Sequence, residues 1–202
     1  MPAEGAVLFE EDRARAAFYA LIARLFHAGP DAPLLAALAG ADDIAGAGET
    51  APLAAAWKAL GAAAAVMDAA AARDEYDSVF IGTGKAEVTP YVSHYLAEAM
   101  QERVLVQLRD DLAAMELGKI PAVAEYEDHL SCLCEVMRHL VAAGSDDAAV
   151  QQQKDFFFKY LFPCYAELCA AVSTSPNTTF YRRVADFTKA FLDVESDSFE
   201  MI

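Results

Sequence analysis

The residues of this chain with the most evident chemistry are two carboxylates and a histidine, Glu125, Asp128 and His129. Their spacing of i, i+3 and i+4 predicts that they converge on the first turn of a helix expected over about 126–143. Such a group could bind a cationic ligand, or it could act as acid and base. The alternative for Asp128 is helix capping, because a carboxylate satisfies the free N–H groups of a helix start.

A second candidate surface combines aromatic residues on either side of a loop. Gly82 and Pro90 bound this loop, and Gly82 is expected to end the preceding helix in a left-handed conformation. The side chains on each flank share a helix face, and such faces can bind an apolar peptide segment. They could equally fill the core of the protein. The side chains concerned are Tyr76, Val79 and Phe80 before the loop, and Tyr91 and Tyr95 after it.

The elements that must position these residues are helices along the whole chain. Helix-forming residues dominate, and β-branched residues never alternate with the period of a strand. Asp31 and Asp146 are expected to begin helices, and Thr50 could cap a long helix. The sequence therefore predicts an all-α, single-domain helical bundle over residues 1–202. Its core is expected at about 11–192, and its acidic tail, 193–202, is expected to fray.

Composition excludes several classes of function. The 31 Asp and Glu residues outnumber the 15 Lys and Arg residues, so the net charge is -16. This charge argues against binding to nucleic acid or to an anionic membrane surface, and it suits a positively charged partner. Alanine is the commonest residue within the hydrophobic fraction of 56%, and no stretch approaches the roughly 18 apolar residues of a spanning helix. The first residues lack the features of a secretory signal, which predicts a cytoplasmic protein.

The cysteines and the Gly84-Lys85 pair do not form a recognisable cofactor site. Cys132 and Cys134 point away from each other on one predicted helix, and Cys164 and Cys169 do so on another. Buried thiols are therefore expected, with a metal site as the alternative. Gly84-Lys85 lacks the earlier glycine of a phosphate-binding P-loop. The prediction is therefore no cofactor, no metal and no catalytic residue. A small-ligand or metal-binding helical enzyme that uses Asp128 and His129 stays as the alternative. The cysteines are Cys132, Cys134, Cys164 and Cys169.

An aromatic run, Phe156–Phe158 followed by Tyr160 and Phe162, cannot be buried on one side of a helix. Consecutive positions are about 100° apart, so at least one of these rings is expected to be exposed or to lie at an interface. A helix that is apolar all round is the alternative. The run leaves open a contact with a partner protein or with a second copy in a homodimer.

The two candidate segments together resemble the TorD/DmsD family of molybdoenzyme maturation chaperones. That family shows aromatic-x-x-Leu-Phe-x-Gly-Pro-Gly, then Pro-aromatic-x-Ser-x-Tyr, and further along Glu-Pro-x-Asp-His-aliphatic. The chain departs from this pattern at Val79, Thr83 and Tyr126, where Leu, Pro and Pro are usual. Its three blocks are Tyr76-x-x-Val79-Phe80-x-Gly82-Thr83-Gly84, Pro90-Tyr91-x-Ser93-x-Tyr95 and Glu125-Tyr126-x-Asp128-His129-Leu130.

The resemblance implies a cytoplasmic, non-catalytic chaperone of the TorD-like fold. Its partners would be the catalytic subunit of a molybdopterin (Mo/W) oxidoreductase and that subunit's basic twin-arginine leader, held for cofactor insertion before export or assembly. Such a leader needs an acidic surface beside an apolar groove, and Glu125, Asp128 and Asp77 are candidates for contacting its arginines. Some relatives have been suggested to bind guanine nucleotides near the Asp-His motif, for which the sequence offers no independent support. The candidate leader- or partner-binding residues are Tyr76, Val79, Phe80, Gly82, Pro90, Tyr91, Ser93, Tyr95, Glu125, Asp128 and His129.

Overall fold

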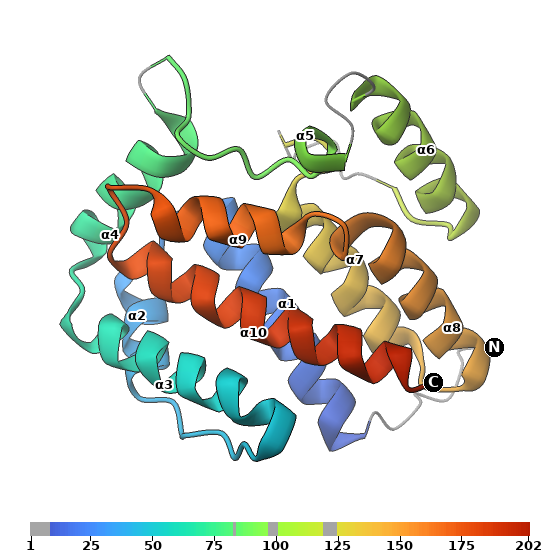
Figure 1. Cartoon of the computed structure of the whole chain (residues 1–202), viewed down its shortest axis with the longest axis horizontal. Helices are drawn as coiled ribbons and strands as arrows, with labels where there is room; N and C mark the ends of the chain where they lie inside the picture. Colours follow the sequence, from blue (N-terminus) through green and yellow to red (C-terminus); the bar gives the residue numbers. More distant parts are fainter. Residues whose placement is uncertain (1–8, 83, 97–100, 119–124) are drawn as a thin grey trace. The chain divides into compact units, whose positions relative to one another are not determined.

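The structure is a computed structural model that describes residues 9–82, 84–96, 101–118 and 125–202. These described residues form helices and turns without a strand, which confirms the predicted all-α bundle (Figure 1). Tyr91 and His129 pair in an isolated antiparallel bridge. The α-helices, in chain order, are α1 (Glu10–His27), α2 (Ala32–Ala39), α3 (Ala51–Val66), α4 (Ala69–Tyr76), α5 (Ser93–Leu96), α6 (Gln101–Ala114), α7 (Leu130–Ala143), α8 (Asp147–Phe156), α9 (Tyr165–Thr174) and α10 (Phe180–Glu200).

Shorter helical turns extend three of these elements. The 3-10 turn η1 (Gly48–Thr50) precedes α3, and the π-helical turns η2 (Asp77–Ile81) and η3 (Phe157–Leu161) continue α4 and α8. Within the aromatic run, Phe157 is fully buried, whereas Phe162, directly after η3, is 42% exposed. The prediction that this run cannot be buried as a whole is confirmed.

The chain divides into two compact units, each built from two separate stretches of sequence. Unit 1 comprises Met1–Ala23 and Tyr91–Cys164, and unit 2 comprises Arg24–Pro90 and Tyr165–Ile202. The boundary between Pro90 and Tyr91 falls inside the second family motif. The candidate residues are therefore described within the unit to which each belongs.

Unit 2 is organised around α10, which packs against α3 and α9, while α2 packs against α3 (Figure 1). The buried face of α10 includes Phe187 and Phe191, both of which are almost completely excluded from solvent. Trp57 of α3 packs against Phe187 with tilted rings whose centroids are 5.4 Å apart. Its Nε1 donates to the carbonyl of Asp42 at 2.9 Å, so Trp57 is half-buried at the edge of the core.

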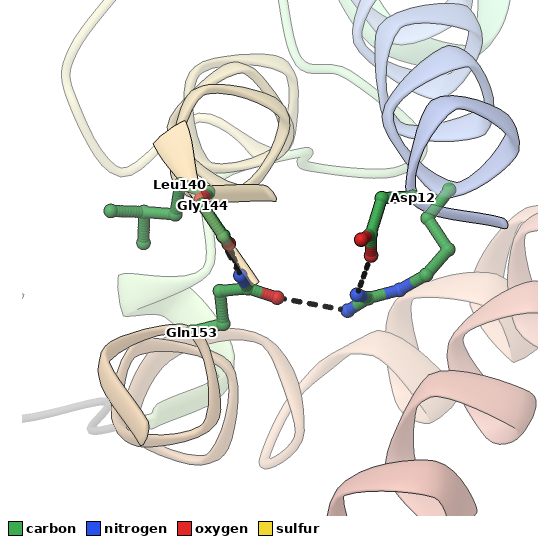
Figure 2. A network of polar contacts seen from close by, with 5 residues as sticks. Asp12, Leu140, Gly144 and Gln153 are labelled. Atoms are coloured by element: carbon green, nitrogen blue, oxygen red, sulfur yellow. Dashed lines mark hydrogen bonds and ion pairs between the residues drawn. The ribbon is translucent and has the colours of Figure 1, made fainter. Parts of the chain in front are cut away.

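Unit 1 is built on α7, which packs against α8 and η3, while α5 packs against α6. One face of α7 is buried as the helical spacing predicts. A buried glutamine, Gln153 of α8, donates from Nε2 to the carbonyls of Leu140 at 3.4 Å and Gly144 at 3.1 Å, near the end of α7. Its Oε1 accepts from Arg15 of α1 at 3.1 Å, and Arg15 also pairs with Asp12 at 3.0 Å (Figure 2). This polar network therefore joins three helices of unit 1.

Several helix boundaries differ from those expected from the sequence. The predicted long helix breaks after Val66, and Asp68 begins α4 by accepting hydrogen bonds from the N–H groups of Ala70 and Ala71. Thr50 makes no side-chain cap to α3. The acidic segment 193–202, which was expected to fray, continues α10 as far as Glu200. Within it Phe199 is only 2% exposed, so an apolar contact holds the last turns in place.

By length and hydropathy, no single helix within the described ranges qualifies as a membrane span. The helices Ala51–Val66 and Ala69–Ile81 are long and apolar enough only when they are counted together, and the chain bends by 117° between them.

Candidate functional site

The candidate residues before Tyr91 belong to unit 2, where the aromatic ones fill the core. Tyr76, Val79 and Phe80 are 7%, 0% and 6% exposed. The Tyr76 hydroxyl donates to the carbonyls of Phe26 at 3.2 Å and His27 at 2.8 Å, at the end of α1. The predicted aromatic face before the loop is therefore internal, in agreement with the alternative that these side chains fill the core.

Tyr181 of α10 completes this aromatic cluster of unit 2. Its ring centroid lies 5.2 Å from that of Phe80 and 5.7 Å from that of Tyr76. The Tyr181 hydroxyl donates to the carbonyl of Leu25 at 2.9 Å. Burial, followed by the charges of neighbouring groups, raises the pKa of this hydroxyl well above its ordinary value. The cluster therefore holds α4, η2 and α10 around the end of α1.

The loop after η2 begins with a conformation that requires glycine. Gly82 has φ +64°, as expected for the residue that ends this helix, and its N–H donates to the carbonyl of Asp77 at 2.7 Å. A Cβ at this position would lie 2.3 Å from the carbonyl oxygen of Lys85. The N–H of Val88 then donates to the carbonyl of Val79 at 3.0 Å, which closes the loop against η2. Pro90, at the end of the loop, is buried.

The remaining candidate residues belong to unit 1, where backbone pairing brings two of the sequence motifs together. The N–H of Val92 donates to the carbonyl of Asp128 at 2.9 Å, beside the bridge between Tyr91 and His129. The ring of Tyr91 meets the ring of His129 edge-on, with centroids 5.0 Å apart, and it lies 6.3 Å from that of Tyr126. This contact between the two segments places the ring of Tyr91 against His129 of the Asp-His motif.

The prediction that Glu125, Asp128 and His129 lie on the first turn of a helix is wrong. The helix begins at Leu130, and His129 is its N-cap, with Nδ1 accepting from the N–H of Ser131 at 3.1 Å. The extended backbone of His129 (φ -65°, ψ 136°) follows from its pairing with Tyr91. The capping role predicted as the alternative for Asp128 therefore belongs to His129.

Asp128 is instead a buried carboxylate with one oxygen left without a donor. The residue is 1% exposed, and its Oδ1 has no hydrogen-bond partner among the residues that the structure describes. Buried carboxylate oxygens normally meet a donor, because an unpaired polar atom in the interior is costly. Burial, together with the negative charges of Glu125 and Asp128, raises the pKa of the Tyr91 hydroxyl. Asp128 directly precedes His129, whose ring meets that of Tyr91.

An ion pair lies beside this motif, and no pattern in the sequence indicates it. Arg109 of α6 donates from Nε to Oε1 of Glu127 at 3.0 Å and from Nη2 to Oε2 at 2.9 Å. We name Glu125, Glu127 and Asp128 the acidic turn, because they are three of the four residues before the N-cap of α7. Carboxylates grouped beside aromatic rings are suited to bind a guanidinium group, which is planar and can pair with a carboxylate through two parallel hydrogen bonds.

The other predicted residues of unit 1, Ser93 and Tyr95, belong to α5. Ser93, at the first position of α5, is buried, and Tyr95 is half-buried with its ring edge-on to that of His94. Among the cysteines, Cys132 is half-buried and the other three are buried, as expected for three of the four. Within the described ranges, no group of three or more His, Cys, Asp or Glu side chains could hold a metal ion.

Comparisons with known proteins agree with the motifs. The family model described as nitrate reductase delta subunit matches residues 47–171, more than half of the chain. The fold is similar to the crystal structure of a protein from Archaeoglobus fulgidus, named as a candidate redox enzyme maturation protein. That similarity has a TM-score of 0.58 at 18% identity and covers 96% of this chain and 99% of the other. No curated protein matches the sequence. The chain therefore belongs to the nitrate reductase delta subunit family, the TorD-like group that its paired motifs resemble.

Proposed function

We propose that this chain is a cytoplasmic chaperone for the maturation of a molybdopterin (Mo/W) oxidoreductase. It binds the apoprotein of the catalytic subunit, or that subunit's basic twin-arginine leader, and holds it for cofactor insertion before export or assembly. Membership of the delta subunit family supports a role beside a redox enzyme. The fold shared with the Archaeoglobus fulgidus protein supports a maturation role.

The observation that carries leader binding is the buried carboxylate of Asp128. Its Oδ1 lacks a donor, and it lies within the acidic turn beside Tyr91. A guanidinium group of the leader would supply the missing donor in a charge-assisted hydrogen bond. The net charge of -16 would attract the basic region of the leader from a distance.

Aromatic side chains beside the acidic turn would take the apolar part of the leader. Tyr126 is 58% exposed and contacts Tyr91 edge-on. Tyrosine side chains give a large contact area at low entropic cost, and they tolerate a partly wet surface. In this proposal Tyr91, Tyr95, Glu125 and Asp128 contact the leader. The buried candidates, Tyr76, Val79, Phe80, Pro90, Ser93 and His129, hold the framework together with the half-buried Gly82.

The role of His129 favours binding over catalysis. Its Nδ1 accepts from the N–H of Ser131 and lies 2.7 Å from the Ser131 hydroxyl, so this nitrogen serves the start of α7. His129 is also 3% exposed. A histidine acting as acid and base needs a ring nitrogen that can reach the reacting group. The proposal is therefore a protein that works by binding, without cofactor or metal of its own.

Calorimetric titration with synthetic peptides tests the proposal. The probe is a leader with an Arg-Arg pair before an apolar run of about ten residues, compared with the same peptide carrying Lys-Lys. We expect saturable binding to the Arg-Arg peptide that weakens with added salt, because exposed charges are screened. Weaker binding of Lys-Lys is expected, because an ammonium group cannot form the two parallel bonds of a guanidinium.

Matched variants connect this binding to the acidic turn. Asp128→Asn and Glu125→Gln should each weaken binding about tenfold or more, which is the value of a charge-assisted hydrogen bond. Glu135→Gln, the same change at an exposed position of α7, is the control and should leave the affinity unchanged. Absence of binding to the Arg-Arg peptide, together with near-stoichiometric metal in protein purified without an affinity tag, would favour the alternative of a metal-binding helical enzyme.

A further inference from the structure

We infer that Arg109 occupies the guanidinium position of the acidic turn in the free protein, and that an incoming arginine of the ligand must displace it. The inference rests on the proposed leader binding, and it adds a regulatory contact within the same site. Arg109 would thereby set the affinity of the site and favour ligands that carry arginine.

The contact itself has the geometry that a ligand arginine would use. Arg109 reaches both carboxylate oxygens of Glu127 at 3.0 and 2.9 Å through two different nitrogens. This paired arrangement is the strongest that a guanidinium makes with a carboxylate. The turn therefore already accommodates one guanidinium, supplied by α6 of the same chain.

The neighbouring Asp128 keeps an unsatisfied carboxylate oxygen while Arg109 is bound to Glu127. Hydrogen bonding to Glu127 and its charge raise the pKa of Arg109, and the charge of Asp128 raises it further. The charge of Asp128 also raises the pKa of Tyr91, and the carbonyl of Asp128 accepts from the N–H of Val92, the residue after Tyr91, at 2.9 Å. Within the described part of the chain, Oδ1 of Asp128 nevertheless has no donor, and the residue is 1% exposed. Arg109 is thus held on Glu127 while the adjacent buried carboxylate stays without a hydrogen bond at Oδ1.

Exposure explains how the contact could open. The Arg109 side chain is 49% exposed, whereas that of Glu127 is 14% exposed. Asp128 directly follows Glu127 in the chain, so release of Glu127 by the flexible, solvent-facing Arg109 side chain frees the carboxylate next to Asp128. Exposed ion pairs are weak, and breaking one changes an equilibrium constant by about fivefold at most. A ligand that also gains a bond to Asp128 can therefore replace Arg109.

The test is calorimetric titration of the full chain with the Arg-Arg leader peptide. Arg109→Ala removes the internal competitor and should tighten binding by about two- to fivefold. Arg109→Lys keeps the charge but loses the paired geometry, so it should also bind more tightly than wild type. Arg138→Ala is the matched control. Its side chain is 45% exposed and also pairs with a carboxylate, and it should leave the affinity unchanged.

A double variant separates displacement from a simple loss of positive charge. If Arg109 competes with the ligand for the carboxylate of Glu127, Arg109→Ala should give no gain in a background that carries Glu127→Gln. A gain that persists in this background, or an Arg109→Ala protein that binds equally or more weakly than wild type, overturns the inference and leaves the proposed function standing. Failure of the wild-type protein to bind the peptide contradicts the proposed function itself. Thermal unfolding of each variant checks that it is folded.

Discussion

The carboxylate of Glu75 accepts a hydrogen bond from the backbone N–H of Tyr181 at 2.7 Å, although 106 residues separate them in sequence. The same carboxylate accepts from the N–H groups of Thr179 at 2.8 Å and Phe180 at 3.2 Å. Thr179 itself makes no side-chain cap. A side chain of α4 therefore caps α10, the longest helix of unit 2, and satisfies donors that a helix start leaves free.

Replacing Glu75 should consequently destabilise unit 2. Glu75→Ala is expected to cost about 1–2 kcal/mol, the usual value of a lost N-cap. Glu75→Gln should cost less, because its oxygen still accepts while the favourable charge at the helix start is lost. Urea unfolding followed by circular dichroism measures both changes. Asp74→Ala, at the exposed neighbouring position of α4, is the control, and an equal loss there would contradict the capping role.

Gly82 is the second position where a small change should have a large effect. Its φ of +64° is unfavourable for any other residue, and a Cβ would come within 2.3 Å of the Lys85 carbonyl oxygen. We expect Gly82→Ala to destabilise the protein by about 2–3 kcal/mol. Gly118→Ala is the comparison, since a Cβ there meets nothing within 4 Å. Chemical unfolding that showed similar stability for the two variants would mean that the loop rearranges freely.

The local helix signals in the sequence predicted much of the fold. Asp31 and Asp146 cap α2 and α8, as their positions before apolar runs indicate. The break after Val66 was missed because the alanine-rich stretch contains neither Pro nor Gly at that point. The helical tail could have been found, since Phe187, Phe191, Glu195 and Phe199 recur every four residues and are all buried.

The candidate site was harder to predict because it depends on contacts between distant segments. Spacing alone placed Glu125, Asp128 and His129 on a helix. The pairing of His129 with Tyr91, 38 residues earlier by their numbers, holds this stretch extended instead. The bond of Arg109 to Glu127 likewise joins residues 18 positions apart, and no local pattern marks it. The motifs thus identified the right residues, while tertiary contacts decided their geometry.

The polar network of Gln153 should contribute strongly to the stability of unit 1. Gln153→Ala removes the donor for the carbonyls of Leu140 and Gly144 and an acceptor for Arg15 (Figure 2). Buried polar groups that lose their partner cost about 1–3 kcal/mol, and we expect a loss near the upper end. Gln152→Ala, at the exposed neighbouring position, should change the free energy of unfolding by no more than about 0.5 kcal/mol. Comparable urea midpoints for the two variants would contradict this role.

Asp111 should make the stability of unit 1 depend on acid pH. Partial burial alone would raise the pKa of its carboxyl, but hydrogen bonds from Lys159, Tyr160 and Gln107 outweigh burial and hold it below its ordinary value. A carboxyl whose pKa is lowered in the folded state stabilises the protein at pH values above the pKa that the same carboxyl has in the unfolded chain, which is about 4. This contribution is lost as the pH falls through the lowered value.

Asp111→Asn therefore should remove part of the acid sensitivity. The variant should be less stable than wild type at pH 7, and the difference should shrink as the pH falls below about 4. Urea unfolding at a series of pH values measures this convergence. Asp110→Asn, at the exposed preceding position of α6, serves as the control. A difference between wild type and Asp111→Asn that stayed constant down to pH 2 would show that Asp111 is not the titrating group.

Tyr76 and Tyr91, both candidates for leader binding, should behave differently when their hydroxyls are removed. Tyr76→Phe loses hydrogen bonds to the carbonyls of Phe26 and His27 inside unit 2. It should therefore lower the free energy of unfolding by about 1–2 kcal/mol and leave the affinity for the Arg-Arg peptide unchanged. Tyr91 is only half-buried beside the acidic turn, so Tyr91→Ala should weaken peptide binding about tenfold. Unfolding and calorimetry on the same samples separate the two effects. A loss of affinity in Tyr76→Phe as large as that in Tyr91→Ala would show that the aromatic core of unit 2 takes part in binding.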